Sequence, residues 1–441
     1  MDGQLLASGI ALIVCVFCWI TKPFGIPYSI SGLIFLGVCV IAGVPPAVAF
    51  SGYATGGFWT LVPALFFGFA LASTGLGKRI AYALLMRLQK PTLPKLLFVF
   101  CAVGIILSVL TPSMTVRVVI IVPIALSCAE LCGFGKGTKE RSILLISAWV
   151  AAVVPGTAWP SGSLNGPILT GTFASSGLGD IVFSEWVRAA LLPVFITVIL
   201  TILLGYLLNK PKEQPALSRS MFLSTFAGIG PVAKNEIVTA VILVGCFIFF
   251  VTRQLHHIPD AAVCITGLIL LFVFGIIKAE NIGTGVNWDL ILFIGGILGY
   301  GAIFEYTGLS KMLVGVIAPA VAPIAGSSTG LFLILAALVF FLWRFVDVAT
   351  FIPTFAIVTA MIPGFAAEFG IDPYVWIPVL VLAQNTFLMT YTNMFALIAE
   401  KSMGENGWNA RTFSRYSFVY CGSAIVAIAV SLPYWAALGL I

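Results

Sequence analysis

Four short polar segments interrupt the long apolar runs of this chain, and they hold the residues that can bind a ligand. Residues 111–117 combine a proline, three hydroxyl side chains and a positive charge. The other three segments lie at 156–165, 344–350 and 384–393. Hydroxyl and amide oxygens suit Na⁺, whereas the free N–H groups at helix N-termini attract anions. The chemistry of this set therefore indicates a site for a small anion, with or without a cation.

Individual residues of these segments are the candidates for the site. Those expected to contact the anion are Ser113, Thr115, Arg117, Ser163, Asn165, Thr350, Thr390 and Asn393. Those expected to form a cation-coupling site are Gly156, Thr157, Asp347, Asn385 and Thr386. No cofactor is expected, apart from Na⁺ or H⁺ as a coupling ion. The sequence has no HExxH motif and only two histidines, so an enzyme is a remote alternative, as is a channel.

Arg117 and Arg344 are the charges that need an explanation. A charge at the centre of a membrane helix costs at least ~2.5–3.5 kcal/mol on insertion scales, so Arg117 must face protein, water or an anion. Either its planar fork clamps a carboxylate of the substrate, or its charge forms a structural ion pair or faces water. Arg344 and Asp347 are three residues apart and can pair on one helix face. The alternative for Asp347 is a role in proton or cation coupling.

The composition identifies the class of protein. Hydrophobic residues make up 60% of the chain, charged residues make up 9%, and the mean hydropathy is +1.12. A soluble domain carries ~25% charged residues. Because the apolar runs are continuous rather than short and alternating, they predict transmembrane helices and not barrel strands. We expect an all-α polytopic membrane protein surrounded by the lipid bilayer, with no nucleic acid as a partner.

The order of the parts repeats along the chain. Each half contains several apolar spans, and then two apolar stretches joined by a short polar turn, which we call a two-legged segment. A span interrupted by polar residues follows in each half. The predicted boundaries are 1–208 for the first repeat, with its hairpin at 96–134 and its broken helix at 142–176; 209–235 for a cytoplasmic connector; and 236–441 for the second repeat, with its hairpin at 328–370 and its broken helix at 373–400. The motif Thr74-Gly75-Leu76 recurs as Thr307-Gly308-Leu309.

Lysine and arginine predict the topology, because short cytoplasmic loops carry them in excess. One side of the membrane carries 17 of the 22 lysines and arginines if the segments on that side are 22–28, 76–95, 134–142, 209–235, 278–288 and 400–416. This assignment requires both two-legged segments to be re-entrant hairpins. Ten crossings of an inner (plasma) membrane result, with both termini outside the cytoplasm. Since each repeat then has five crossings, the second repeat is inverted, as in many secondary transporters.

Over most of its length the chain resembles the divalent anion:sodium symporter family. The residues that carry the resemblance are Phe50-Ser51-Gly52, Thr74-Gly75-Leu76-Gly77-Lys78-Arg79, the tip at 111–117, Asn165, Thr307-Gly308-Leu309 and Asn393. The segment Pro112-Ser113-x-Thr115-x-Arg117 is closest to the hairpin tip of the dicarboxylate exchangers in this family. The family's tips read Ser-Asn-Thr, whereas Met114 and Ala349 stand at the two asparagine positions here.

The resemblance implies transport of di- or tricarboxylates, such as succinate, malate or 2-oxoglutarate, by an elevator motion in a homodimer. A sulfonate, another oxyanion and a cation are the alternative substrates. The asparagines of the tips help to coordinate Na⁺ in the family, so their replacement favours anion exchange or proton coupling over sodium symport. Arg117 would then supply part of the charge compensation that Na⁺ gives.

Overall fold

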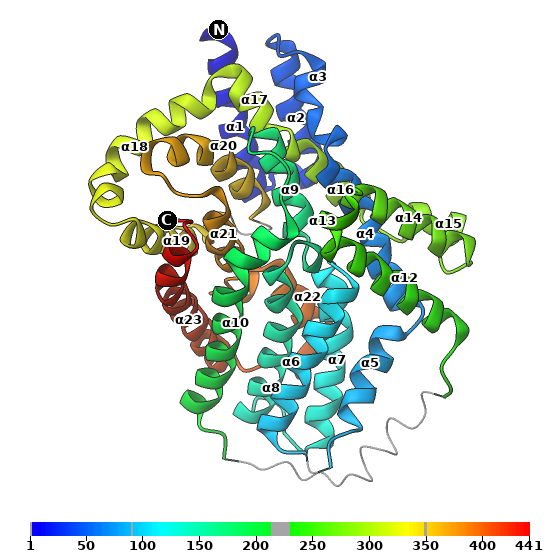
Figure 1. Cartoon of the computed structure of the whole chain (residues 1–441). Helices are drawn as coiled ribbons and strands as arrows, with labels where there is room; N and C mark the ends of the chain where they lie inside the picture. The colour runs from blue at the N-terminus through cyan, green and yellow to red at the C-terminus, as the bar shows by residue number, and fades with distance from the viewer. Residues whose placement is uncertain (1, 90, 213–229, 348–350) are drawn as a thin grey trace.

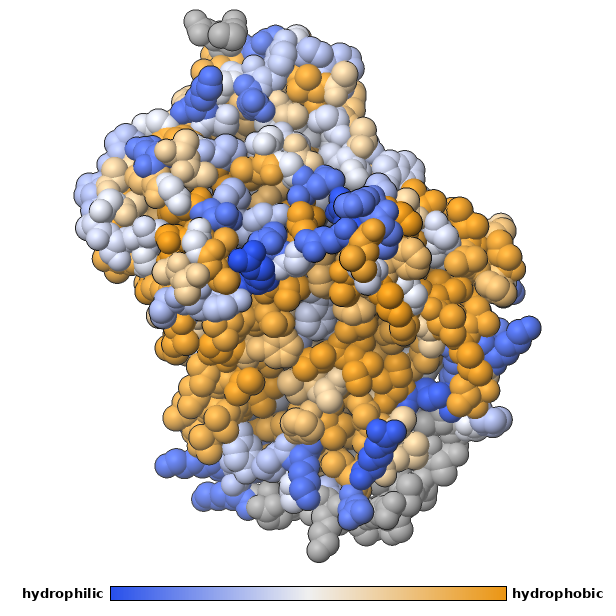
Figure 2. Space-filling model, viewed as in Figure 1, coloured by the Kyte–Doolittle hydropathy of each residue, from blue (hydrophilic) through white to orange (hydrophobic). Residues whose placement is uncertain are grey.

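The computed structural model describes residues 2–89, 91–212, 230–347 and 351–441. In this part of the chain the regular elements are helices, and eleven of them are long and apolar enough to cross a membrane. Their 18–28 residues suit a hydrocarbon core about 30 Å thick. Figure 2 shows hydrophobic side chains over the middle of one face and hydrophilic ones gathered at its lower end. The prediction of an all-α polytopic membrane protein is confirmed, and the number of crossings stays a prediction.

Helices and short 3₁₀ turns (η) alternate along both halves of the chain (Figure 1). The elements of the first half are α1 (Asp2–Thr21), η1 (Pro23–Gly25), α2 (Tyr28–Ile41), α3 (Pro46–Ala49), η2 (Ser51–Ala54), α4 (Gly56–Ser73), α5 (Leu76–Leu85), α6 (Leu93–Leu110), α7 (Met114–Leu131), α8 (Lys139–Val153), η3 (Pro155–Ala158), η4 (Pro160–Gly162), α9 (Asn165–Ser175) and α10 (Phe183–Asn209). Those of the second half are α12 (Lys234–Val251), α13 (Arg253–His256), α14 (Asp260–Val273), α15 (Ala279–Thr284), α16 (Trp288–Leu298), α17 (Tyr300–Thr307), α18 (Leu309–Ser327), α19 (Thr329–Trp343), α20 (Ile352–Phe369), η6 (Pro373–Val375), α21 (Trp376–Gln384), η7 (Thr390–Thr392), α22 (Met394–Met403), η8 (Gly404–Asn406) and α23 (Ala410–Ala437).

The repeated Thr-Gly-Leu motif makes the same bend in both halves. Gly75, between α4 and α5, has φ +81° and ψ 0°. Gly308, between α17 and α18, has φ +80° and ψ 6°. Glycine enters this left-handed region easily because it has no Cβ, whereas other residues are strained there. The motif therefore ends one helix and starts the next at a new angle in each half.

Corresponding helices of the two halves make corresponding contacts with exchanged partners. Helix α4 packs against α14, and α16 packs against α2. Likewise α7 packs against α22, and α20 packs against α9. Helices α10 and α23, the last long helix of each half, pack along each other. This exchange is the pattern expected if the second half repeats the first.

Helices α6 and α7 are joined by a short tip, and both pack mainly against α8 (Figure 1). Helix α6 ends at Leu110, and Pro112 cannot donate a backbone hydrogen bond. Oγ1 of Thr111 accepts the N–H of Ser113 at 3.1 Å, and Oγ of Ser113 accepts the N–H of Val116 at 3.3 Å. These side chains replace helical hydrogen bonds at the turn, so a new helix begins at Met114.

Helices α19 and α20 occupy the second segment for which a hairpin is expected, and residues 348–350 between them lie outside the described residues. Helix α20 follows Phe351, which has φ +60°. The carboxylate of Asp347 accepts the N–H of Phe351 at 3.1 Å and the hydroxyl of Thr354 at 2.6 Å. Asp347 therefore holds the N-cap residue Phe351 and the side chain of Thr354 at the start of α20, where negative charge is favourable.

Helix α8 is enclosed by protein on all sides. Every residue from 140 to 160 is buried, and α8 contacts α6, α7, α10 and α23. The helix stops at Val153, and the two 3₁₀ turns η3 and η4 follow before α9 begins. This interruption lies within the broken helix expected at 142–176, and the one between α21 and α22 lies within 373–400.

Candidate functional site

A hydrogen bond between two amides joins the two helix breaks. Asn165 is the first residue of α9, and its Nδ2 donates to Oε1 of Gln384, the last residue of α21, at 3.2 Å. The two residues are 3% and 4% exposed. Because a buried amide without a partner costs about 1–3 kcal/mol, this bond favours contact between the breaks.

Arg117 is fully buried behind the tip of the first hairpin. Its Nε donates to the carbonyl of Ala152 at 2.6 Å, and its Nη1 donates to the carbonyls of Thr111 at 2.7 Å and Gly162 at 2.6 Å. Among the described residues no carboxylate forms an ion pair with Arg117, and its Nη2 has no hydrogen-bond partner. The structure thus shows a third arrangement, in which backbone dipoles surround the charge.

Arg344 joins the other hairpin to the other break. Its Nη1 donates to the backbone carbonyl of Asp347 at 2.5 Å, and its Nη2 donates to the carbonyl of Thr392. The ion pair expected between the side chains of Arg344 and Asp347 is therefore wrong. Helix α19 ends at Trp343, so the helical geometry that brings residues i and i+3 together does not continue to Asp347.

A cavity of about 590 Å³ lies beside the first hairpin tip. One wall consists of residues at the beginning of α7, α9 and α22, namely Ser113, Thr115, Val116, Leu164, Met394 and Ile398. The other wall consists of the loop between α1 and α2, part of α4 and the segment that precedes and begins α16. Three helices therefore begin at this wall, and the N-terminal end of a helix carries partial positive charge.

Charged and capping groups give the cavity its polarity. Lys22 is the cationic side chain among the described lining residues, and Asp289 is the acidic one. Oδ1 of Asp289 accepts both the N–H of Ser29, at 3.2 Å, and its hydroxyl. Asn393 directly precedes the lining residue Met394, and its Oδ1 accepts the N–H groups of Phe395 and Ala396 in the first turn of α22 at 2.9 and 3.3 Å. Ser113 and Asn393 thus cap helices that begin at the cavity.

The other residues expected to bind the anion do not line this cavity in the described part of the chain. Ser163 is 0% exposed, and its hydroxyl has no partner among the described residues. Asn165 is engaged by Gln384, and Thr390 lies in the turn η7. Thr350 falls outside the described residues. The structure therefore brings Ser113 and Thr115 to the cavity and leaves the rest in the surrounding breaks.

The candidates for cation coupling are spread over both breaks. A Cβ on Gly156 would lie 2.1 Å from the carbonyl oxygen of Gly162, so close packing requires glycine there. Thr157 donates its hydroxyl to the carbonyl of Val154 at 2.7 Å, and the carbonyl of Thr386 accepts Nδ2 of Asn393 at 3.2 Å. Asn385 is fully buried, and neither polar atom of its amide has a partner among the described residues.

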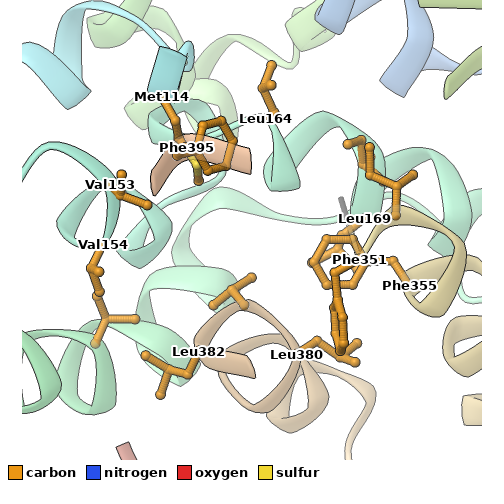
Figure 3. Close-up of a cluster of buried hydrophobic side chains, with 14 of the residues drawn as sticks. Met114, Val153, Val154, Leu164, Leu169, Phe351, Phe355, Leu380, Leu382 and Phe395 are labelled. Atoms are coloured by element: carbon orange, nitrogen blue, oxygen red, sulfur yellow. The ribbon is translucent and has the colours of Figure 1, made fainter. Parts of the chain in front are cut away.

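An apolar cluster fills the region where the tips and breaks meet (Figure 3). Met114 comes from the first tip, Leu164 from the first break, Phe351 from the start of α20 and Phe395 from the start of α22; these residues are between 0% and 6% exposed. Met114 stands where the family resemblance places an asparagine. Its side chain adds apolar packing to this cluster and offers no oxygen to a cation.

Sequence reasoning passed over three residues that the structure places at the site. Lys22 and Asp289 lie at the ends of apolar spans, where charged residues are ordinary, so no motif distinguished them. Gln384 belongs to a polar break, but its partner Asn165 is 219 residues away in the sequence. Contacts over such distances leave no periodic pattern in a single sequence.

Comparison with known proteins gives a family match and several relatives. The family described as the sodium:sulfate symporter transmembrane region matches residues 4–441. Dicarboxylate transporter 1 of chloroplasts from Arabidopsis thaliana is 27% identical over 318 residues, which are 69% of this chain and 55% of the relative. The inner membrane protein YbhI of Escherichia coli is 24% identical over 69% of this chain and 64% of its own length. The putative malate transporter YflS of Bacillus subtilis is 23% identical over 65% of this chain and 61% of its own length.

The chain therefore matches between about half and two thirds of the length of these relatives. Among solved structures, the YdaH transporter of Alcanivorax borkumensis superimposes with a TM-score of 0.56 over 89% of this chain and 88% of that one, at 14% identity. This likeness shows a shared fold. Because the family match covers nearly the whole chain, the protein belongs to the sodium:sulfate symporter family, a family of membrane transporters and not of enzymes.

Proposed function

We propose that this protein is a secondary active transporter of small organic anions, most of all di- or tricarboxylates of the succinate, malate and 2-oxoglutarate class. The cavity beside the first tip carries the proposal. Three helices begin at its wall, and each N-terminus stabilises an anion by about 0.3–1 kcal/mol. Asp289, the carboxylate in the described lining, already accepts two hydrogen bonds from Ser29. The site thus offers more positive than negative potential to a ligand.

The relatives support organic acids as the substrates. One is named a dicarboxylate transporter and another a putative malate transporter. The cavity of about 590 Å³ also falls within the range of ~300–1,000 Å³ for small-molecule sites. The family description names sulfate, so an inorganic oxyanion or a sulfonate is the second candidate.

For the coupling mechanism we favour exchange or proton coupling over sodium symport. Met114 is packed in an apolar cluster, so the first tip lacks the side-chain oxygen of an asparagine. The charge of Arg117 lies close behind the same tip and repels a cation, by ~4 kcal/mol at 4 Å with an effective dielectric of 20. The same charge stabilises a bound anion without touching it.

The proposed architecture consists of two inverted repeats of five crossings with re-entrant hairpins, and the proposed transport motion is an elevator. The exchanged contacts of α4 with α14 and of α16 with α2 support the pseudo-two-fold relation. The repeat boundaries, the homodimer and the extracytoplasmic termini belong to this proposal. A single cysteine at position 218, in the connector, tests the topology: labelling only from the extracytoplasmic side would refute it.

Uptake into proteoliposomes tests the substrate class. The panel holds labelled succinate, malate, 2-oxoglutarate, citrate, sulfate and a sulfonate, each with the others as competitors. We expect uptake of diacids that other diacids inhibit. Sulfate uptake that diacids leave unchanged would establish the second candidate instead. Uptake of a cation, with no anion transported or competing, would reject both.

A further inference from the structure

We propose that Lys22 recruits the anion into the cavity: its ammonium group meets a carboxylate of the incoming substrate in the conformation described here and not in the opposite one. This inference rests on the function proposed above. Lys22 follows α1 and lines the same cavity as Ser113 and Thr115. Because Arg117 is enclosed by backbone carbonyls, Lys22 is the full positive charge that a ligand can reach in the described lining.

The ammonium group of Lys22 is held by a weak partner. Its Nζ lies 4.3 Å from the ring centroid of Tyr28, which also lines the cavity. No ion pair connects Lys22 with Asp289 or another carboxylate of the described residues. A cation–π contact at an exposed site is weaker than a charge-assisted hydrogen bond to a carboxylate. An anion that enters the cavity therefore draws the ammonium away from the ring.

The backbone around Lys22 has an unusual conformation. Lys22 has φ +45° and Phe24 has φ +55°, and both are non-glycine residues in the left-handed region. Gly25 follows with φ +72° and also lines the cavity. Such strain persists where the surrounding structure imposes it, and it is concentrated at functional sites. Here the residues with positive φ form the short connection between α1 and α2 that carries Lys22.

The two walls of the cavity belong to different parts of the molecule. Ser113 and Thr115 belong to the first hairpin, whereas Lys22 belongs to the α1–α2 loop, and all three line the cavity. In the proposed elevator motion the hairpin moves relative to this loop and carries the substrate with it. The anion then meets Lys22 at one membrane face and leaves it behind at the other. Residues of the hairpin stay with the substrate at both faces.

The test compares the KM for a dicarboxylate at the two membrane faces, in right-side-out and inside-out vesicles. Because the predicted topology places residues 22–28 in the cytoplasm, we expect Lys22→Gln to raise KM about tenfold at the cytoplasmic face, the loss typical of one hydrogen bond to a charged group. The KM at the outer face and the maximal rate stay unchanged. Lys22→Arg retains the charge and restores the cytoplasmic KM. Thr115→Ala, in the hairpin, raises KM at both faces.

Lys311→Gln is the matched control, because Lys311 is an exposed lysine outside the described cavity lining; it leaves both KM values unchanged. Unchanged KM values at both faces for Lys22→Gln would overturn the inference, and so would an equal rise at both. If Lys22→Gln does not run as a monodisperse peak on size exclusion, the Lys22→Arg variant is measured instead. Its ratio of the KM for a dicarboxylate to the KM for a monocarboxylate is compared with that of the wild type. A changed ratio overturns the inference. Failure of the wild type to take up any dicarboxylate would instead reject the proposed function.

Discussion

Nη1 of Arg117 lies 2.6 Å from the carbonyl oxygen of Gly162, so the tip of the first hairpin is tied to the helix break of the same half. In the second half, Nη2 of Arg344 donates to the carbonyl of Thr392 in the other break. Tips and breaks both lack the regular hydrogen bonds of a helix. A guanidinium group suits them because it carries five donors in a planar fork and is always charged.

Arg117→Lys is expected to damage both the fold and transport. A single ammonium group cannot reach the three carbonyls that the fork binds, so buried acceptors lose their donors. We expect a loss of about 2–4 kcal/mol in stability and a fall of about tenfold or more in the uptake of the substrate. Thermal unfolding in detergent and proteoliposome uptake measure the two effects.

Arg188→Lys is the matched control for Arg117→Lys. Arg188 is exposed and pairs with Glu185 on the same helix, so the same substitution there changes stability by less than about 1 kcal/mol. Wild-type melting temperature and uptake in Arg117→Lys would contradict the structural role of its fork.

Gly75→Ala and Gly308→Ala are expected to destabilise the protein by about 1–2 kcal/mol each, the cost of an L-residue in the left-handed region. Steric collision does not contribute, because the nearest atom to a Cβ on Gly75 lies at 3.8 Å and none lies within 4 Å for Gly308. Gly315→Ala in α18 also meets no atom within 4 Å, but it lies within the helix and should stabilise slightly. Equal melting temperatures for all three variants would show that the bends at Gly75 and Gly308 do not require glycine.

Asp347→Asn distinguishes a structural role at the start of α20 from a role in coupling. The amide retains one acceptor oxygen where the carboxylate uses two, so we expect a loss of about 0.5–2 kcal/mol in stability. The dependence of uptake on a pH gradient should stay as in the wild type. Asp372→Asn is the control, because Asp372 caps the turn η6 by accepting the N–H of Tyr374 at 2.8 Å. Loss of pH-gradient dependence in Asp347→Asn alone would assign the coupled proton to this carboxylate.

The coupling ion can be identified with vesicles that are empty or loaded with unlabelled substrate, under imposed Na⁺ or H⁺ gradients. We expect loading or a proton gradient to stimulate uptake, because Met114 provides no oxygen ligand for Na⁺ at the first tip. Replacing Na⁺ by choline should leave the rate within about twofold, which is less than 1 kcal/mol. Strong Na⁺ dependence in empty vesicles would show that backbone carbonyls suffice for a sodium site.

The sequence predicts the helices and their interruptions because these depend on local chemistry. Pro112 and the hydroxyls beside it end one helix and cap the next within a few residues, so the first tip was visible in the sequence. The partners of Arg117 were not, because Ala152 and Gly162 lie 35 and 45 residues away and contribute only backbone carbonyls. Any residue type supplies a carbonyl, and therefore no residue pattern marks these contacts.

For Arg344, local spacing predicted a contact that the structure does not contain. The spacing of Arg344 and Asp347 favours an ion pair only if both residues lie on a continuous helix, and α19 ends at Trp343. Beyond that end, Arg344 donates to the carbonyl of Thr392, 48 residues further along the chain. The spacing rule does not apply here, because the helix that it assumes has already ended.

The enclosure of α8 constrains where the molecule can shear. A helix that touches protein around its whole circumference cannot slide past α6, α7, α10 or α23 without breaking close packing on every side at once. These helices must travel together as one rigid body during any large displacement. The cavity offers a boundary for such a displacement, because the hairpin tip and the α1–α2 loop both line this open space. A transporter built in this way would place its substrate at the boundary between the moving body and the stationary one.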